Sequence, residues 1–256
     1  MNMISLISIE CMKIRRSKIA AILLIPVILM WLPSILNASV SFDTQGIPIT
    51  PEHNFFIQGF LGMVWFMIPA TFVICTVLLI QTERSNRGFL KMLALPVHAS
   101  KFCLAKFAVL ILLAVLQMIF CIAAYYVCAA IISHTQNYDF ILEPLYVCRI
   151  VASLYLATLP MISIFWLLAT WISTPIFSIG AGLASIVPSV LIINTKWWFL
   201  DPMSYPFYVL MTEYGKAAKG IYETQIRWIP WIPVAAVILI TSVIASCMMF
   251  GYKERR

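Results

Sequence analysis

The sequence is poor in charged residues and lacks the motifs of several soluble protein classes. Only 11% of its 256 residues are Asp, Glu, Lys or Arg, whereas 62% are hydrophobic. Soluble domains average about 25% charged and roughly 45–50% apolar residues, so the composition indicates that lipid surrounds most of this chain. The seven cysteines form no C-x-x-C pair and the three histidines, which lie in expected loops, have no metal-ligand spacing. We therefore expect no metal site.

Long apolar runs define the expected architecture. A helix that crosses a hydrocarbon core about 30 Å thick needs about 20 apolar residues. Six runs of this kind occur, at about 19–38, 58–80, 103–132, 150–172, 176–195 and 229–250. Basic residues precede the first run, as in a signal peptide, but no clear small-x-small cleavage site follows it. We expect an all-α polytopic membrane protein whose six transmembrane helices form a single transmembrane domain, 1–256.

The basic residues divide unequally between the two sides that six spans define. Twelve of the 17 Lys and Arg residues fall on the side of both termini, and five fall on the other side. The positive-inside rule therefore predicts that both termini are cytoplasmic. Seven of the ten acidic residues fall on the outer side. Since the basic groups flank membrane ends and do not gather on one folded face, we expect no nucleic-acid partner.

The chain also lacks the residues that ATP hydrolysis or transport driven by an ion gradient would require. Its nearest approach to a phosphate-binding loop is "YGKAAKG", where Gly215 and Lys216 lack the upstream Gly and the following Ser or Thr. No Asp or Glu lies deep in an apolar run, which argues against transport driven by an ion gradient. Lys106 is near enough to the start of the third run to extend its ammonium group to the cytoplasmic interface. No nucleophile and base pattern occurs, so we expect no enzyme, no catalytic residue and no cofactor in this chain.

Uncharged polar and small residues lie within the runs. The hydroxyl and amide side chains are expected to bond across helices rather than bind a substrate; they are Thr71, Thr76, Gln117, Thr158, Ser163 and Thr170. Gly180 and Ala184 form a small-xxx-small pair that permits close helix approach, within this chain or against another. Cys128 and Cys148 flank one outer loop, and their sequence positions do not decide whether they form a disulfide.

Two polar segments are predicted to be helices at the inner membrane surface. In residues 1–18, Ile4, Ile7 and Cys11 have near-helical spacing, which predicts an interfacial N-terminal helix, with an ordinary flanking segment as the alternative. The second segment lies within "QTERSNRGFLKMLALPVHASKF", where Glu83 favours a helix start and Pro96 ends the helix. This helix, at 82–97, suits either an interfacial anchor or a docking element for a partner subunit.

The second segment resembles a known family. Glu83, Arg84, Gly88, Leu93, Leu95, Pro96 and Lys106 follow one another as in the loop after the second span of ABC type-2 export permeases, where E-R, L-x-L-P and A-K-F recur. The six spans and the longer outer segment fit the same family. Within it, "LISIECMKIRRSKIAAILL" resembles the lantibiotic-immunity permeases, in which an acidic residue and then K-x-x-R-S-K precede the first span.

The resemblance implies a transport complex in the plasma membrane of a bacterium. Residues 82–97 would be a cytoplasmic coupling helix that docks into a separate ATP-binding subunit. The residues expected in coupling are Glu83, Arg84, Gly88, Phe89, Leu90, Lys91, Leu95 and Pro96. The expected partners are two copies of the ATPase subunit, which bind ATP and magnesium, a second permease chain, identical or homologous, membrane lipids and a peptide substrate.

The outer segment 196–228 bears on the substrate. Its three tryptophans and the one just after it suit a belt at the outer interface; they are Trp197, Trp198, Trp228 and Trp231. Glu52, Asp201 and Glu213 are candidate contacts for a cationic amphiphilic peptide, or they are solvated loop charges. The sequence thus favours the permease of an exporter that expels a lantibiotic or similar antimicrobial peptide. The alternatives are an exporter of a small drug, lipid or ion, and a non-transporting membrane scaffold.

Overall fold

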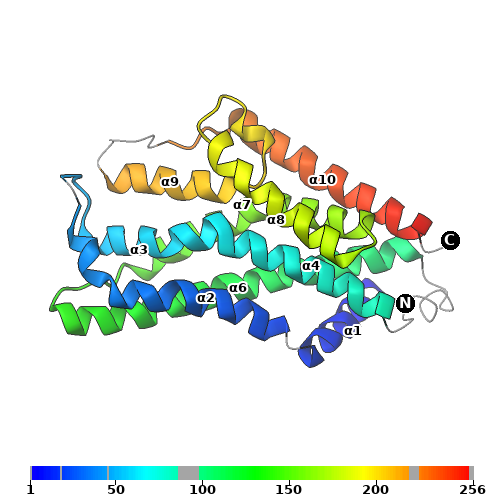
Figure 1. Ribbon diagram of the computed structural model, residues 1–256, viewed down its shortest axis with the longest axis horizontal. Coiled ribbons are helices and arrows are strands. Elements are labelled where there is room, and N and C mark those ends of the chain that lie inside the picture. Colours follow the sequence, from blue (N-terminus) through cyan, green and yellow to red (C-terminus); the bar gives the residue numbers. More distant parts are fainter. Residues whose placement is uncertain (1, 18, 45, 86–97, 219–224, 254–256) are drawn as a thin grey trace.

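The regular elements of the protein are helices. The computed structural model describes residues 2–17, 19–44, 46–85, 98–218 and 225–253, and every regular element in these ranges is helical (Figure 1). The elements are α1 (Met3–Arg16), α2 (Ile19–Leu36), η1 (Ala38–Phe42), α3 (Pro51–Gly62), η2 (Met63–Met67), α4 (Ile68–Ser85), α6 (Ala99–Gln136), α7 (Pro144–Trp171), α8 (Pro175–Ile192), η3 (Trp198–Leu200), α9 (Tyr205–Ala217) and α10 (Trp228–Lys253).

Five helical segments in the described ranges are long and apolar enough to cross a membrane. They are Pro51–Gln81, Ala99–Gln136, Pro144–Trp171, Pro175–Ile192 and Trp228–Phe250. The first of them joins α3, η2 and α4, in which η2 is a single wide turn of π-helix. A further apolar helix, Ala21–Leu36, is shorter. The number of spans is therefore five by length and composition, or six when α2 is included.

Helix-start signals extend some helices beyond the apolar runs. The second run was expected from residue 58, but α3 begins at Pro51, with Thr50 as its N-cap and Glu52 in its first turn. Proline at the first helical position and an acid near the helix N-terminus both favour this earlier start. Glu52 and His53 are therefore helical, and the expectation of a loop here was wrong. His134 likewise lies in the last turn of α6, which ends where Asn137 adopts φ 52°.

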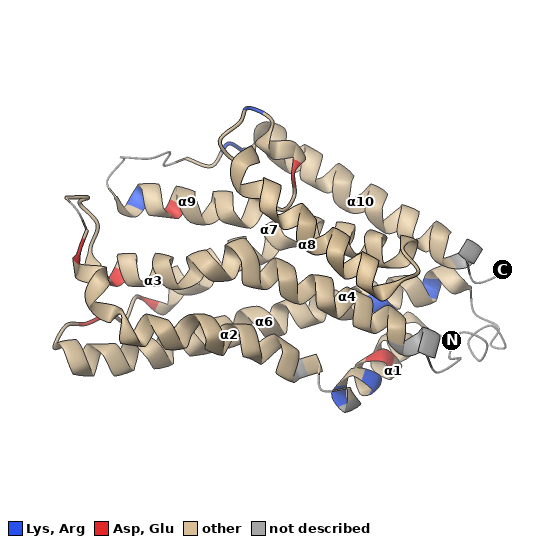
Figure 2. Cartoon of the chain, in the orientation of Figure 1, with Lys and Arg blue, Asp and Glu red and all other residues tan. Residues whose placement is uncertain are grey.

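The long helices lie side by side along the long axis of the molecule (Figure 1). α6 packs against α1, α2, α7 and α10, and α4 packs against α7 and α8. α1 and the last turns of α10 lie at one end, which we call the α1 end, and α3 begins at the opposite end, which we call the α3 end. Charged residues lie at these two ends and in the connection between α8 and α10 at the top of the view, whereas the long helices between the ends are largely uncharged ribbon (Figure 2).

The segment between α8 and α10 folds back onto the bundle at the α3 end. Its helix α9 packs along α7 and α3. The ring of Trp198 in η3 stacks on Tyr208 of α9, with 3.9 Å between the ring centroids. Trp197 and Trp228 are exposed, as a belt at the interface requires, but Trp231 is buried against this aromatic cluster. The expectation that all four tryptophans form an exposed belt was wrong for Trp231.

Hydroxyl groups inside the helices bond to their own helices. Thr71 donates to the carbonyl oxygen of Met67 at 2.6 Å, one turn earlier. Thr76, Thr158, Ser163 and Thr170 each donate to a carbonyl three residues back. The prediction of bonds across helices was wrong for these residues, because the nearest acceptor for Ser or Thr in a helix is the carbonyl of the preceding turn. The amide of Gln117 is buried and has no partner among the described residues.

The small residues of α8 face in two directions. A Cβ atom at Gly182 would lie 2.7 Å from a methyl carbon of Val73, so this glycine permits close packing of α8 on α4. A Cβ at Gly180 would meet nothing within 4 Å among the described residues. Gly180 and Ala184 are both exposed. The predicted small-xxx-small pair therefore faces away from the described part of the chain.

Candidate functional site

A buried ion pair joins α1 to α6 at the α1 end. Nζ of Lys106 lies 2.6 Å from Oε2 of Glu10, and the side chains are 1% and 4% exposed. The other carboxylate oxygen of Glu10 lies 2.7 Å from Nζ of Lys13. The expected extension of Lys106 to the membrane interface was therefore wrong. Because α1 packs against α6 and presents a carboxylate there, the lysine is compensated inside the protein.

The side of α1 that packs against α6 includes residues outside the set expected at the membrane interface. Ile4 is 82% exposed, whereas Leu6 and Glu10 are buried. Leu6 and Glu10 are four residues apart and so lie on one side of the helix, which faces α6. Two features of the sequence could have indicated the pair. Glu10 is the sole acid before residue 43, and Lys106 is the sole charged residue in the third apolar run.

The residues expected in coupling fall at the same end of the bundle. Glu83 and Arg84 belong to the last turn of α4, and α6 begins at Ala99. Lys106 follows Ala99 by seven residues, which is about 10 Å along the helix axis. The other residues expected in coupling lie outside the described residues; they are Gly88, Phe89, Leu90, Lys91, Leu95 and Pro96. The expectation that Glu83 begins a separate helix was wrong, because α4 continues through Ser85, and a coupling role for the segment that follows stays a prediction.

Neighbouring contacts hold the first turns of α6 in the bundle. Nε1 of Trp166 in α7 donates to Sγ of Cys103 at 3.4 Å. Sγ of Cys247 in α10 lies 3.9 Å from the carbonyl oxygen of Ser100. α6 is thus contacted by α1, α7 and α10 within its first turns. A movement of this part of α6 would be transmitted to all three helices.

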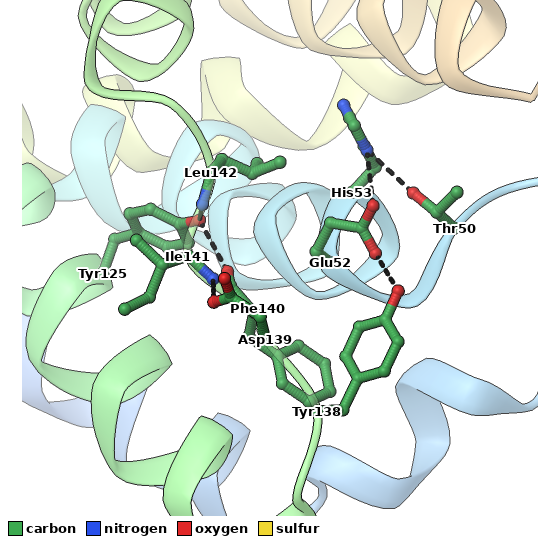
Figure 3. Close-up of polar contacts among 9 residues, drawn as sticks. All are labelled: Thr50, Glu52, His53, Tyr125, Tyr138, Asp139, Phe140, Ile141 and Leu142. Carbon is green, nitrogen blue, oxygen red and sulfur yellow. Dashed lines mark hydrogen bonds and ion pairs between the residues drawn. The ribbon is translucent and has the colours of Figure 1, made fainter.

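The candidate substrate contacts do not form one cluster, because Glu52 lies in α3, Glu213 lies in α9 and Asp201 directly follows η3. The hydroxyl of Tyr138 donates to Oε2 of Glu52, and Oε1 of Glu52 is 3.7 Å from Nδ1 of His53 (Figure 3). This hydrogen bond to the carboxylate raises the pKa of Tyr138 to about 12. Glu213 forms an ion pair with Lys216 in the same helix. Two of the three predicted acids therefore already have partners.

Asp201 differs from the other two acids. Its Oδ1 accepts a hydrogen bond from the backbone N–H of Met203 at 3.1 Å, while its Oδ2 is buried without a partner among the described residues. Burial raises the pKa of Asp201 above its ordinary value, and the Met203 bond partly offsets this. Asp201 lines a cavity of about 360 Å³ together with Thr195 and Trp197. The predicted acidic face is therefore divided among three separate environments.

A tyrosine holds the connection between α6 and α7 in place at the α3 end. The hydroxyl of Tyr125 donates to the carbonyl of Phe140 and accepts from the N–H of Leu142, both at 3.0 Å (Figure 3).

Cys128 and Cys148, near this connection, are free thiols. Over the described ranges, no three His, Cys, Asp or Glu side chains are grouped to hold a metal ion.

The fold and the comparison with known proteins define the class of protein. The apolar helices define a multi-pass membrane protein. A sequence model of the ABC-2 family transporter proteins matches residues 6–189, which is more than half of the chain. The chain belongs to this family, and it is the permease component of an ABC transporter, in which a separate subunit binds and hydrolyses ATP. No curated protein and no solved structure matches the sequence.

Proposed function

We propose that this permease belongs to an ATP-driven exporter that expels a lantibiotic or similar cationic peptide from the membrane and so confers immunity to it. One observation carries the proposal. Glu10 is the acid of the motif that resembles lantibiotic-immunity permeases, and Lys106 is the lysine of the A-K-F motif that follows the coupling segment. Their buried ion pair joins the two motifs into one structural unit.

This unit suits the transmission of force from the ATPase. Residues 86–98 connect α4 to α6, and α6 is joined to α1 by the ion pair of Lys106. Closure of two ATPase subunits on ATP and magnesium would displace the coupling segment and, with it, the start of α6. Because the ion pair is buried, α1 would move with α6 rather than separate from it. Glu83, Arg84, Phe89, Leu90 and Lys91 are the residues proposed to receive the displacement, and Gly88, Leu95 and Pro96 shape the segment.

The charge distribution supports cytoplasmic termini. α1 carries Lys13 and Arg15 at one end of the bundle, and Glu52 in α3 and Glu213 in α9 lie toward the other (Figure 1). Positively charged segments remain on the cytoplasmic side during insertion. The α1 end would therefore face the cytoplasm of a bacterium, where the ATPase binds. The acidic residues of the α3 end would then face the side from which a cationic peptide approaches.

The exposed face of α8 supports a second permease chain. Gly180 and Ala184 leave room for a helix from another molecule, because nothing in the described chain occupies the space beside Gly180. Small residues at this spacing permit close approach of two membrane helices. The proposed complex contains two permeases, identical or homologous, and two ATPases.

The test is reconstitution with the ATP-binding subunit encoded beside this chain. The purified complex in lipid discs is assayed for ATP hydrolysis with a lantibiotic and with an unrelated cationic amphiphile. Stimulation by the lantibiotic alone is expected. Equal stimulation by both compounds would favour an exporter of small amphiphiles, and failure to bind the ATPase would leave a membrane scaffold.

Coupling variants separate transport from insertion. Glu83→Ala and Pro96→Ala are expected to preserve membrane insertion while abolishing both peptide-stimulated hydrolysis and protection of cells. Lys101→Ala, at an exposed position in the first turn of α6, is the matched control and should retain both activities. Unchanged protection in the Glu83 and Pro96 variants would remove the proposed coupling role.

A further inference from the structure

A cavity of about 720 Å³ lies at the α3 end, apart from the α1 end where coupling is proposed. Its walls come from segments that are far apart in the sequence. α3 contributes His53, α7 contributes Tyr146 and Arg149, α9 contributes Glu213 and Lys216, and α10 contributes Trp228. The volume is within the range of roughly 300–1,000 Å³ that is typical of small-ligand sites.

The charges around the cavity favour an anion. Glu213 and Lys216 neutralise each other in an ion pair within α9. Arg149 is exposed at the cavity and forms no ion pair with a described residue. With His53 neutral, the lining has one net positive charge, which the guanidinium group of Arg149 provides. Such a group offers a planar set of donors that matches two oxygens of a phosphate.

The rest of the lining favours an amphiphile over a soluble ion. Ile150, Ile226 and Trp228 give the cavity aliphatic and aromatic surface beside the arginine. Trp228 is 59% exposed and begins α10, which is a candidate membrane span. Tryptophan at the end of a span typically lies at the level of the lipid headgroups. Arg149 is also five residues from the start of a candidate span, so the two residues belong to the same interfacial zone.

We propose that this cavity binds the phosphate-bearing headgroup of an anionic membrane lipid, with Arg149 as the phosphate ligand and Trp228 beside the glycerol backbone and first acyl carbons. The bound lipid connects α7, α9 and the start of α10, and it therefore stabilises the folded-back segment between α8 and α10. The proposal does not depend on which substrate is exported.

The test measures lipid retention by the purified permease. Phosphatidylglycerol, phosphatidylcholine and soluble glycerol 3-phosphate are each added to delipidated protein, and retention is measured by native mass spectrometry and thermal unfolding. Retention of phosphatidylglycerol above phosphatidylcholine is expected. Equal retention of the two lipids would overturn the proposal. An equal shift in unfolding temperature with glycerol 3-phosphate would identify a soluble phosphate site instead and overturn the lipid assignment.

Three variants locate the site. Arg149→Gln should weaken phosphatidylglycerol binding about tenfold or more, since hydrogen bonds to charged groups contribute about 1.5–3 kcal/mol. Lys196→Gln removes an exposed basic residue outside the cavity and should bind as the original chain does. Glu213→Gln removes the one acid of the cavity lining and should strengthen binding. A change in this direction cannot arise from misfolding, and unchanged binding in the Arg149 and Glu213 variants would refute the assignment.

Discussion

The carboxylate of Glu10 and the ammonium group of Lys106 are 2.6 Å apart although 96 residues separate them in the chain. Both side chains are buried, so each charge depends on compensation inside the protein. An ion pair in this setting is weak evidence of net stability, because both ions lose their hydration. The loss of one partner is nevertheless costly, because it leaves the other charge buried without compensation. The difference between this cost and the small net contribution of the intact pair can be measured.

Removal of one charge of the pair should destabilise the permease. Glu10→Gln is expected to lower the free energy of unfolding by about 3–5 kcal/mol, the usual cost of breaking a buried pair. Lys13→Gln is the matched control, because Lys13 binds the same carboxylate but is 48% exposed, and it should cost less than about 1 kcal/mol. The measurement is thermal or denaturant unfolding in detergent micelles.

A double substitution distinguishes a structural pair from a general loss of packing. Glu10→Leu combined with Lys106→Leu replaces both ions with apolar groups and should recover most of the stability lost in Glu10→Gln. If the double variant loses as much free energy of unfolding as Glu10→Leu and Lys106→Leu lose together when measured singly, the two residues are not coupled in the folded protein.

The class of fold follows from composition, but the contacts of the site do not. Apolar runs identify the membrane helices because the bilayer requires long apolar segments with internally bonded backbones. Hydropathy alone begins the second run at residue 58, whereas the proline and the acid of the first turn place the start of α3 at Pro51. The lone acid of α1 and the lone charge of the third run indicate a pair, but the burial of Lys106 also depends on which helix packs beside α6, and hydropathy does not specify that neighbour.

Gly180 and Gly182 of α8 should respond differently to the same substitution. Gly182→Ala places a methyl group 2.7 Å and 2.8 Å from two methyl carbons of Val73 and is expected to cost about 1–3 kcal/mol through overpacking. Gly180→Ala meets nothing within 4 Å in the described chain and should leave the unfolding temperature of the monomer unchanged.

A substitution at Gly180 also tests whether a second permease chain packs on α8. Gly180→Leu should weaken association of two permeases, because a large side chain prevents close approach of helices at this face. Association is measured by crosslinking or fluorescence energy transfer in lipid discs. Full association of the leucine variant would place the interface on another helix.

The buried oxygen of Asp201 predicts a pH-dependent stability. Burial raises the pKa of this carboxyl group in the folded state, so the folded protein binds the proton more tightly than the unfolded chain. The contribution of Asp201 to stability is therefore greatest at low pH and falls as pH rises from the unfolded pKa of about 3.9 through the folded one. Asp201→Asn removes this loss and retains an oxygen for the N–H of Met203.

The Asn variant should unfold at a higher temperature than the original chain at pH 7.5, and the difference should disappear near pH 4. Asp43→Asn, at an exposed carboxylate, controls for the loss of one negative charge. A difference that is the same at both pH values would show that the effect comes from packing and not from ionisation.

Cys103 and Cys247 test the packing of α10 on α6 at the α1 end. The two thiols interact, and Sγ of Cys247 also lies 3.9 Å from the carbonyl oxygen of Ser100. A variant that keeps these two cysteines and replaces the other five with Ala or Ser should form an intramolecular disulfide when treated with copper phenanthroline, read as protection from alkylation after the protein is unfolded in sodium dodecyl sulfate. A variant that keeps Cys121 and Cys247 is the control, because Cys121 lies five turns further along α6 and should remain fully alkylated. If the control pair crosslinks as well as the first pair, the register of α10 against α6 differs from the one described.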